Sequence, residues 1–169
     1  FLKSNKIPQE TLFVNGNTGD FISGGHIPKS LKISNNNLKM EVIKTLFLDK
    51  HFSLWNKYKD ITYRSKLEKE FEVTLKSLIV GSERIFNLVN IFEMMEWYHR
   101  QVKFVISGQK VYEFLNREWR LPLWEFPMKN FFEQLNDSYK VDQFFYRKCL
   151  MDINWQGIWR NLPINQKNI

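Results

Sequence analysis

Hydrophobic side chains recur at helical spacing along most of this chain, and one short run is typical of a strand. Thr11-Leu12-Phe13-Val14 is short, apolar and rich in strand-forming residues, which favours a buried strand. Apolar positions three or four residues apart predict helices over about 38–50, 64–79, 82–106, 109–115, 128–135 and 141–151. The pattern therefore predicts a mainly α-helical chain with one short N-terminal strand.

Turn and capping residues set the expected ends of these helices. The polar run 34–37 offers an N-cap to the first helix, Gly81 ends the second, and Ser82 begins the third. The third helix has the longest apolar stripe, which includes His99. A histidine packed and hydrogen-bonded in the interior is the plainer interpretation of His99, and a ligand or a base is the alternative.

The strand runs into a loop of small residues, Asn15-Gly16-Asn17-Thr18-Gly19-Asp20, which we call the first motif. Glycines and short polar side chains let backbone amides come close to an anion such as a phosphate. Asp20 could hold a metal ion or a polar substrate group, and an aspartate that caps a turn or a helix is the alternative. Ser23-Gly24-Gly25 extends the same loop.

A second irregular segment, Glu118-Trp119-Arg120-Leu121-Pro122-Leu123-Trp124-Glu125, is called the second motif here. Pro122 disfavours helix for its neighbours, so the segment is expected to be extended. A buried arginine needs a carboxylate, and Glu118 stands two residues from Arg120. Taken alone, this pair is either a structural ion pair or part of a functional site.

Size and composition place the chain among ordered globular proteins. Its 169 residues are 43% hydrophobic and 16% aromatic, which suits one domain with a sizeable core. The formal charge of +7 comes from lysines scattered among carboxylates, so a solvated basic surface is a better interpretation than a nucleic-acid patch. Because Phe1 follows no initiator methionine or signal peptide, we expect a fragment of a longer protein.

The cysteines, the histidines and the lengths of the apolar runs further limit the kinds of site and of protein that this sequence can represent. Cys149 is the only cysteine, which rules out an internal disulfide and a cysteine-cluster metal site, and we expect it to be a core thiol. The three histidines lack the spacing that places two metal ligands on one helix face. No apolar run approaches the roughly 20 residues of a membrane span, so a cytoplasmic protein is expected.

The two motifs together resemble the asparagine-synthetase-like ATP-pyrophosphatase (PP-loop) family. In that family a strand ends in a loop of the form S-G-x-G-x-D-E, and a segment E-x-R-x-P follows later in the chain. The segments Phe13–Pro28 and Tyr112–Leu135 are most similar to the branch of surface-polysaccharide amidotransferases. The resemblance spans nearly the whole chain. It implies an α/β family fold, of which this chain is the C-terminal portion and lacks the nucleotide-binding half.

The resemblance also implies an activity. A synthetase of this family activates a carboxyl or carbonyl oxygen with ATP and Mg²⁺, releases pyrophosphate, and lets ammonia displace AMP. Asp20 would be the catalytic aspartate that meets pyrophosphate through the metal ion. The cofactor-binding positions would be Asn15, Gly16, Asn17, Thr18 and Gly19. The residues that brace the site would be Lys110, Glu118 and Arg120.

Several positions depart from the family pattern. The nucleotide-gripping Ser-Gly-Gly-x-Asp-Ser loop is absent, Phe21 replaces the acidic residue after the loop aspartate, and Asn15 replaces the first serine. The catalytic lysine expected just before Tyr146-Arg147 is also missing. Lys140 or Lys148 could replace it in a different register, and each is otherwise an exposed helix lysine.

The partners implied are a nucleotide-loop half, a glutaminase domain or subunit that supplies ammonia, and a sugar or amino-acid acceptor, with no nucleic acid and no membrane span. By itself the chain is not expected to catalyse.

Two alternative functions stay open. One is asparagine synthetase proper, which Phe21 and the tryptophan-rich second motif disfavour. The other is a non-catalytic helical remnant or interaction module, which the absent nucleotide loop and lysine favour.

Overall fold

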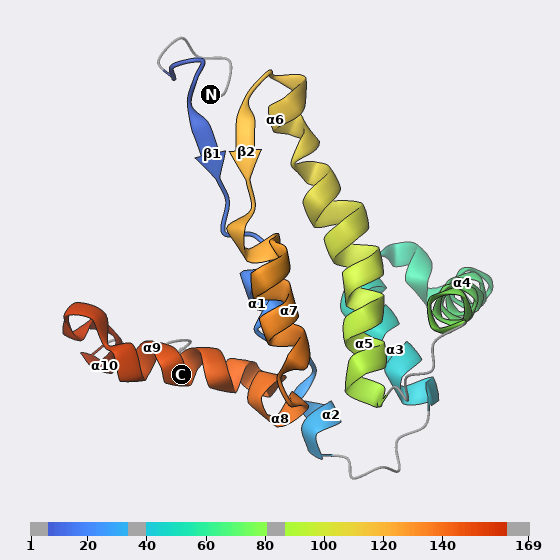
Figure 1. Cartoon of the computed structure of the whole chain (residues 1–169). Coiled ribbons are helices and arrows are strands. Elements are labelled where there is room, and N and C mark those ends of the chain that lie inside the picture. Colours follow the sequence, from blue (N-terminus) through green and yellow to red (C-terminus); the bar gives the residue numbers. More distant parts are fainter. Residues whose placement is uncertain (1–6, 34–39, 81–86, 162–169) are drawn as a thin grey trace. The chain divides into compact units, whose positions relative to one another are not determined.

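The computed structural model describes residues 7–33, 40–80 and 87–161, and it divides the chain into two compact units. The first unit combines residues 1–27 with 109–169, and the second comprises residues 28–108. Both units are mainly helical, as the sequence predicts (Figure 1). No helix within the described ranges has the length and apolar character that crossing a membrane requires.

The first unit contains the sheet found in the described residues. Its strands, β1 (Leu12–Val14) and β2 (Glu118–Arg120), run parallel (Figure 1). Its helices are α1 (Gly19–Ile22), α6 (Lys110–Phe114), α7 (Phe126–Gln134), α8 (Asp137–Lys140), α9 (Phe144–Ile153) and α10 (Ile158–Asn161). Short 3-10 turns η3 (Pro122–Trp124), η4 (Val141–Gln143) and η5 (Trp155–Gly157) connect them. The strand predicted at 11–14 is confirmed as Leu12–Val14, but its expected burial is wrong, because Leu12 and Val14 are exposed. The second motif is extended only over Glu118–Arg120, which pairs with β1, and the expectation of an extended chain is wrong for Pro122–Trp124, where proline begins a 3-10 turn.

The second unit is helical throughout its described residues. It comprises α2 (Lys29–Ile33), α3 (Met40–Phe52), the 3-10 turn η1 (Asn56–Lys59), α4 (Ile61–Ile79), α5 (Leu88–Glu96) and the π-helix η2 (Trp97–Ile106). The Phe47 ring lies in its core, 5.4 Å from the Phe71 ring and 6.1 Å from the Phe92 ring between centroids. These rings come from α3, α4 and α5, so the apolar stripes of the three helices meet as their spacing predicts.

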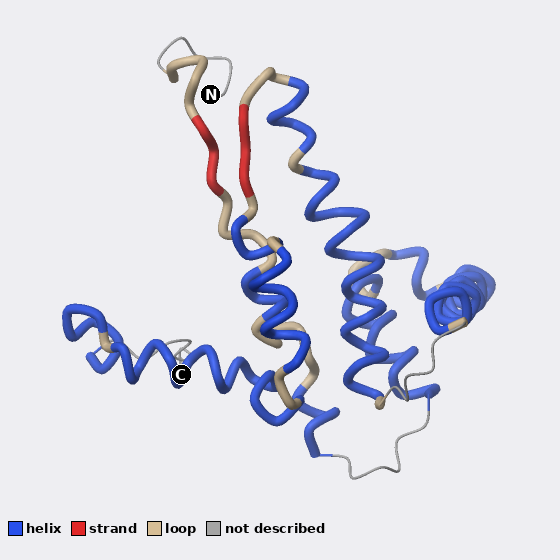
Figure 2. Tube along the Cα trace, viewed as in Figure 1, coloured by secondary structure: helices blue, strands red, loops and turns tan. Residues whose placement is uncertain are grey.

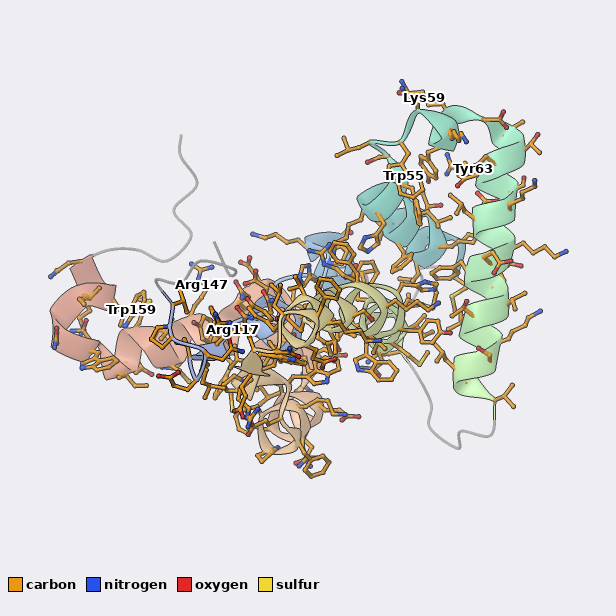
Figure 3. All side chains as sticks on the ribbon, turned by 90° about the horizontal axis from the view of Figure 1, so that it is seen from above. Trp55, Lys59, Tyr63, Arg117, Arg147 and Trp159 are labelled. Carbon is orange, nitrogen blue, oxygen red and sulfur yellow. The ribbon has the colours of Figure 1, made fainter. Side chains whose placement is uncertain are left out.

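The connection from α3 to α4 is a capped turn. The Asp60 carboxylate accepts hydrogen bonds from the backbone N–H groups of Thr62 (2.8 Å) and Tyr63 (3.1 Å), which satisfies two free donors at the start of α4. Figure 3 labels Trp55, Lys59 and Tyr63 around this turn. The helix begins three residues before the predicted position 64 because Asp60 provides the cap.

The third predicted helix differs most from expectation. Its described part, α5, begins at Leu88, because Asn87 has an extended backbone and its side chain accepts a hydrogen bond from the Asn90 N–H at 2.9 Å. From Trp97 to Ile106 it continues as a π-helix. The capping positions 34–37, Gly81 and Ser82 lie outside the described residues. Extended π-helices are rare, and apolar spacing alone does not distinguish them from α-helix.

A buried carboxylate joins α3 to α5. The Glu96 side chain is 1% exposed, and its Oε1 lies 2.8 Å from Lys50 Nζ and 2.5 Å from His51 Nε2. Burial tends to raise the pKa of Glu96, but the hydrogen bonds from His51 and Lys50 outweigh it and lower that pKa below its ordinary value. The carboxylate is therefore held ionised inside the second unit.

Candidate functional site

The parallel pairing of β1 and β2 brings the two motifs together (Figure 2, red). Leu12 pairs with Glu118, and Val14 pairs with Arg120. The pairing continues one step further, because the backbone N–H of Asn15 donates to the Arg120 carbonyl at 3.0 Å. Parallel strands end at the same edge of a sheet, so the first motif and the Leu-Pro-Leu-Trp part of the second leave the sheet side by side.

Hydrogen bonds between residues far apart in sequence, just before each strand begins, fix this register. The buried Arg117 guanidinium, labelled in Figure 3, donates to the carbonyl oxygens of Pro8 and Ile7, the latter at 3.2 Å. Gln9 Nε2 donates to the Asn116 carbonyl at 2.7 Å. A slip of one residue would turn every side chain of a strand to the opposite face, so these anchors ensure that the same residues stay paired.

The ion pair of the second motif forms, but on an exposed surface. Arg120 Nη2 lies 3.8 Å from Glu118 Oε2, and the two side chains are 58% and 75% exposed. The expectation of a buried arginine is therefore wrong. Residues two apart on a strand lie on the same face of the sheet. Among the described residues, no other element covers the face that carries Glu118 and Arg120. Their role in bracing a site stays a prediction.

The first motif is held by side-chain contacts at its start and is open in its middle. Asn15 Nδ2 donates to Gln109 Oε1 at 2.7 Å and to the Tyr112 hydroxyl at 3.3 Å. A Cβ on Gly16 would meet no atom within 4 Å, whereas a Cβ on Gly19 would lie 3.0 Å from Leu123 Cδ1. Asn15 thus ties the loop to the start of α6, and Gly19 packs against the second motif. Asn17 is exposed.

Thr18 combines backbone strain with an unpartnered hydroxyl. Its φ of 80° lies in the left-handed region, which is rare for a β-branched residue. The residue is 7% exposed, and its Oγ1 has no hydrogen-bond partner among the described residues. A buried hydroxyl without a partner is costly, and such strain concentrates at ligand sites. Thr18 is therefore the loop residue that combines backbone strain with a hydroxyl able to make a further hydrogen bond.

Asp20 lies in the short helix α1 with its side chain exposed. Its backbone carbonyl accepts from the Gly25 N–H at 2.7 Å, which closes the turn that follows. One carboxylate oxygen, Oδ1, lies 3.4 Å from Nε2 of Gln143, a residue distant in sequence. The alternative of a helix-capping aspartate does not apply to its side chain here, since the cap position of α1 is Thr18 and no side-chain cap bond is made.

The end of α8 packs against the Ser23-Gly24-Gly25 turn. A Cβ on Gly24 would lie 2.3 Å from the Lys140 carbonyl oxygen, and Gly24 has a φ of 87°. Lys140 is 5% exposed, so its interpretation as an exposed helix lysine is wrong. Lys148 does fit that interpretation, because it is exposed and its Nζ lies 2.7 Å from Asp152.

Gln143 is the residue of this site that the sequence reasoning missed. It lies where the resemblance expects a lysine, before Tyr146-Arg147, and the structure brings it to Asp20 and Ser23. Its place depends on left-handed backbone at two non-glycine residues, Asp142 and Gln143, for which the sequence carries no signal. Lys110, by contrast, is exposed at the start of α6 and makes none of the described contacts between the motifs.

The acidic and histidine residues described do not form a metal site by themselves. No group of three or more His, Cys, Asp or Glu side chains within the described ranges could hold a metal ion. Mg²⁺ is commonly bound through one or two carboxylates together with the phosphates of a nucleotide and water. The single exposed carboxylate of Asp20 fits a Mg²⁺ ion that arrives with a phosphate ligand, and it does not fit a protein-only cage.

The second unit also contains buried polar side-chain atoms that lack hydrogen-bond partners among the described residues. They include Glu96 Oε2, His99 Nε2 and Gln101 Oε1. Burial lowers the pKa of His99, with Lys103 and His51 acting in the same direction. His99 is half-buried, with its ring centroid 5.7 Å from that of Phe47, so its packing against the core is confirmed but full burial is not. The expected hydrogen bond is not found at Nε2 among the described residues.

No protein-family model, curated protein or solved structure matches this chain. The roles of Asp20, Lys140 and the loop residues therefore stay predictions.

Proposed function

We propose that this chain is the C-terminal part of an ATP-dependent amide ligase that acts on a sugar or sugar acid in surface-polysaccharide biosynthesis. The observation that carries the proposal is the register of β1 and β2. Because both strands end at the same edge of the parallel sheet, the loops that follow them leave that edge together, beside Asp20. The carboxyl ends of parallel strands are where α/β proteins bind nucleotides and substrates.

In the proposed reaction, an oxygen of the acceptor attacks the α-phosphorus of ATP and pyrophosphate leaves. Ammonia then attacks the activated carbon, and AMP leaves with the oxygen that had attacked. Asp20 would hold Mg²⁺ together with pyrophosphate, and the ion would neutralise charge that develops on the leaving group. Gly16 and Thr18 would face the phosphates, since one has open space around it and the other has an unused hydroxyl.

The exposed face of the sheet supports a larger protein around it. Val14 is 61% exposed and Leu12 is 46% exposed, both on the face that carries Glu118 and Arg120. Parallel sheets are normally covered on both faces, and two strands alone are marginal. We therefore infer that a nucleotide-loop half adjoins this sheet, and that a glutaminase domain or subunit supplies the ammonia.

The test uses a natural polypeptide that carries this chain together with a Ser-Gly-Gly-x-Asp-Ser loop. Isotope exchange between ATP and pyrophosphate is measured with a sugar acid and, separately, with aspartate as acceptor. Asp20→Asn is expected to lower the exchange rate about 100-fold or more, since a preorganised charge at the leaving group is removed. The matched control is Asp152→Asn, which alters only an exposed surface pair with Lys148. Exchange that survives Asp20→Asn would overturn the metal role, and exchange with aspartate alone would favour asparagine synthetase.

A second candidate is a helical interaction module without catalysis. It is favoured by apolar side chains exposed along the C-terminal helices, namely Phe144, Met151, Ile153, Trp155 and Ile158. Scattered exposed apolar residues are normal, but a series of this kind on neighbouring elements is typical of a contact surface. A folded polypeptide that carries both motifs and the nucleotide loop, yet supports no exchange with any acceptor, would favour this candidate.

A further inference from the structure

The backbone at the start of α9 is bent into an unusual shape. Asp142 has a φ of 62° and Gln143 has a φ of 55°, both in the left-handed region. Such conformations cost roughly 1–3 kcal/mol each for non-glycine residues, and they persist only where the surrounding structure holds them. Helix α8 has already ended at Lys140, since Val141 has a ψ of 132°, and the two left-handed residues follow it. The Gln143 residue is 9% exposed at this bend.

The Gln143 amide makes two contacts with the loop that carries Asp20. Its Nε2 donates to the Ser23 hydroxyl at 2.7 Å and lies 3.4 Å from Asp20 Oδ1. A glutamine amide nitrogen has two hydrogens, so one nitrogen can serve both oxygens. The bond to Ser23 is short and fixes the amide, and the longer contact then restricts where the Asp20 carboxylate can lie.

The Gln143 amide packs closely against Gly25. A Cβ on Gly25 would lie 3.0 Å from Gln143 Cδ and 3.1 Å from its Nε2. Ser23 is itself held, because its hydroxyl donates to the Gly19 carbonyl at 2.6 Å. The amide therefore packs against the Ser23-Gly24-Gly25 turn, and Asp20 is the only exposed member of the group formed by Asp20, Ser23 and Gln143.

We propose that Gln143 is a positioning residue, whose side-chain amide holds the Asp20 carboxylate in one orientation for Mg²⁺ and pyrophosphate. The metal and pyrophosphate part of this inference rests on the proposed function. The orientation of Asp20 does not rest on it and can be measured in the chain alone. Gln143 acts through Asp20 and does not touch the reacting atoms.

The test compares Gln143→Asn and Gln143→Met by NMR in the full 169-residue chain. Asparagine tolerates left-handed backbone but is one methylene too short to reach Asp20, and methionine keeps the length but lacks the donor. Three-bond couplings at Asp20 report its χ1 rotamer. We expect one rotamer in the parent chain and averaged couplings in both variants. Gln134→Met, an exposed glutamine on α7, is the matched control and should leave the couplings unchanged.

A second measurement adds Mn²⁺ with inorganic pyrophosphate and follows paramagnetic broadening of the amides around Asp20. We expect broadening centred there in the parent chain, and an affinity about 3- to 10-fold weaker in the Gln143 variants. Asp20 couplings that are identical in parent and variants would overturn the positioning role. If the Asp20 couplings are averaged in the variants but Mn²⁺ with pyrophosphate broadens no amides in the parent chain, the positioning role stands and the pyrophosphate assignment is overturned.

Discussion

Replacing Gly24 with alanine tests the packing between the turn that follows Asp20 and the end of α8. The new Cβ would lie 2.3 Å from the carbonyl oxygen of Lys140, where about 3 Å is the closest approach that Cβ atoms normally make. Both atoms belong to backbone, so neither can rotate away. Either the turn or the segment at Lys140 must move.

Two costs add in this variant. Alanine at the φ of 87° of Gly24 costs about 1–2 kcal/mol, because its Cβ approaches its own carbonyl. Forcing the two backbones apart costs a further 1–3 kcal/mol or so, typical of overpacking. We therefore expect Gly24→Ala to lower the free energy of unfolding of the first unit by about 2–5 kcal/mol.

The assay is amide hydrogen exchange resolved along the chain, supported by urea unfolding. Exchange in residues 12–25 and 137–145 should accelerate by about 30-fold or more, because each 1.4 kcal/mol corresponds to a factor of ten. The matched control is Gly16→Ala, whose Cβ would meet nothing within 4 Å. It should change the stability by no more than about 0.5 kcal/mol. Equal protection in the two alanine variants would refute the packing of Lys140 against Gly24.

Two predictions concern the second unit. Glu96→Gln leaves the Lys50 ammonium and the His51 ring without their buried carboxylate and should destabilise the unit by about 3 kcal/mol, measured by urea unfolding. Glu41→Gln, on an exposed carboxylate that pairs with Lys44, should cost under about 1 kcal/mol, and equal effects would contradict the buried bridge. The folded-state pKa of His99 lies below its ordinary value of 6.5, so the folded chain binds fewer protons than the unfolded chain just below pH 6.5. Stability should therefore fall as the pH drops below about 6.5. His99→Phe should weaken this dependence in thermal unfolding at pH 7 and pH 5.5, and an unchanged pH dependence would exclude His99 as its source.

Periodicity and turn residues predicted much of the local structure. The strand Leu12–Val14 and the extended start of the second motif could be predicted from the sequence, because each depends on neighbouring residues. The π-helix from Trp97 could not be predicted, because extended π-helices are rare and the apolar spacing of this segment also fits an α-helix.

Only part of the candidate site could be predicted from the sequence. Asp20 and the loop before it stood out because small residues next to a carboxylate are a local signal. Gln143 did not, since its position depends on two left-handed residues and on contacts with a turn 120 residues earlier in the chain. The burial of Lys140 was missed for a similar reason, because a lysine in a polar helix gives no sign that a glycine turn covers it.

We propose that the complete protein activates its acceptor as an adenylate before ammonia displaces AMP. The most direct measurement labels the activated oxygen of the acceptor with oxygen-18 and analyses the nucleotide product by mass spectrometry. An adenylate leaves that oxygen on phosphorus, so the account predicts labelled AMP, formed together with amide and pyrophosphate. Unlabelled AMP, or ADP and phosphate in its place, would contradict it.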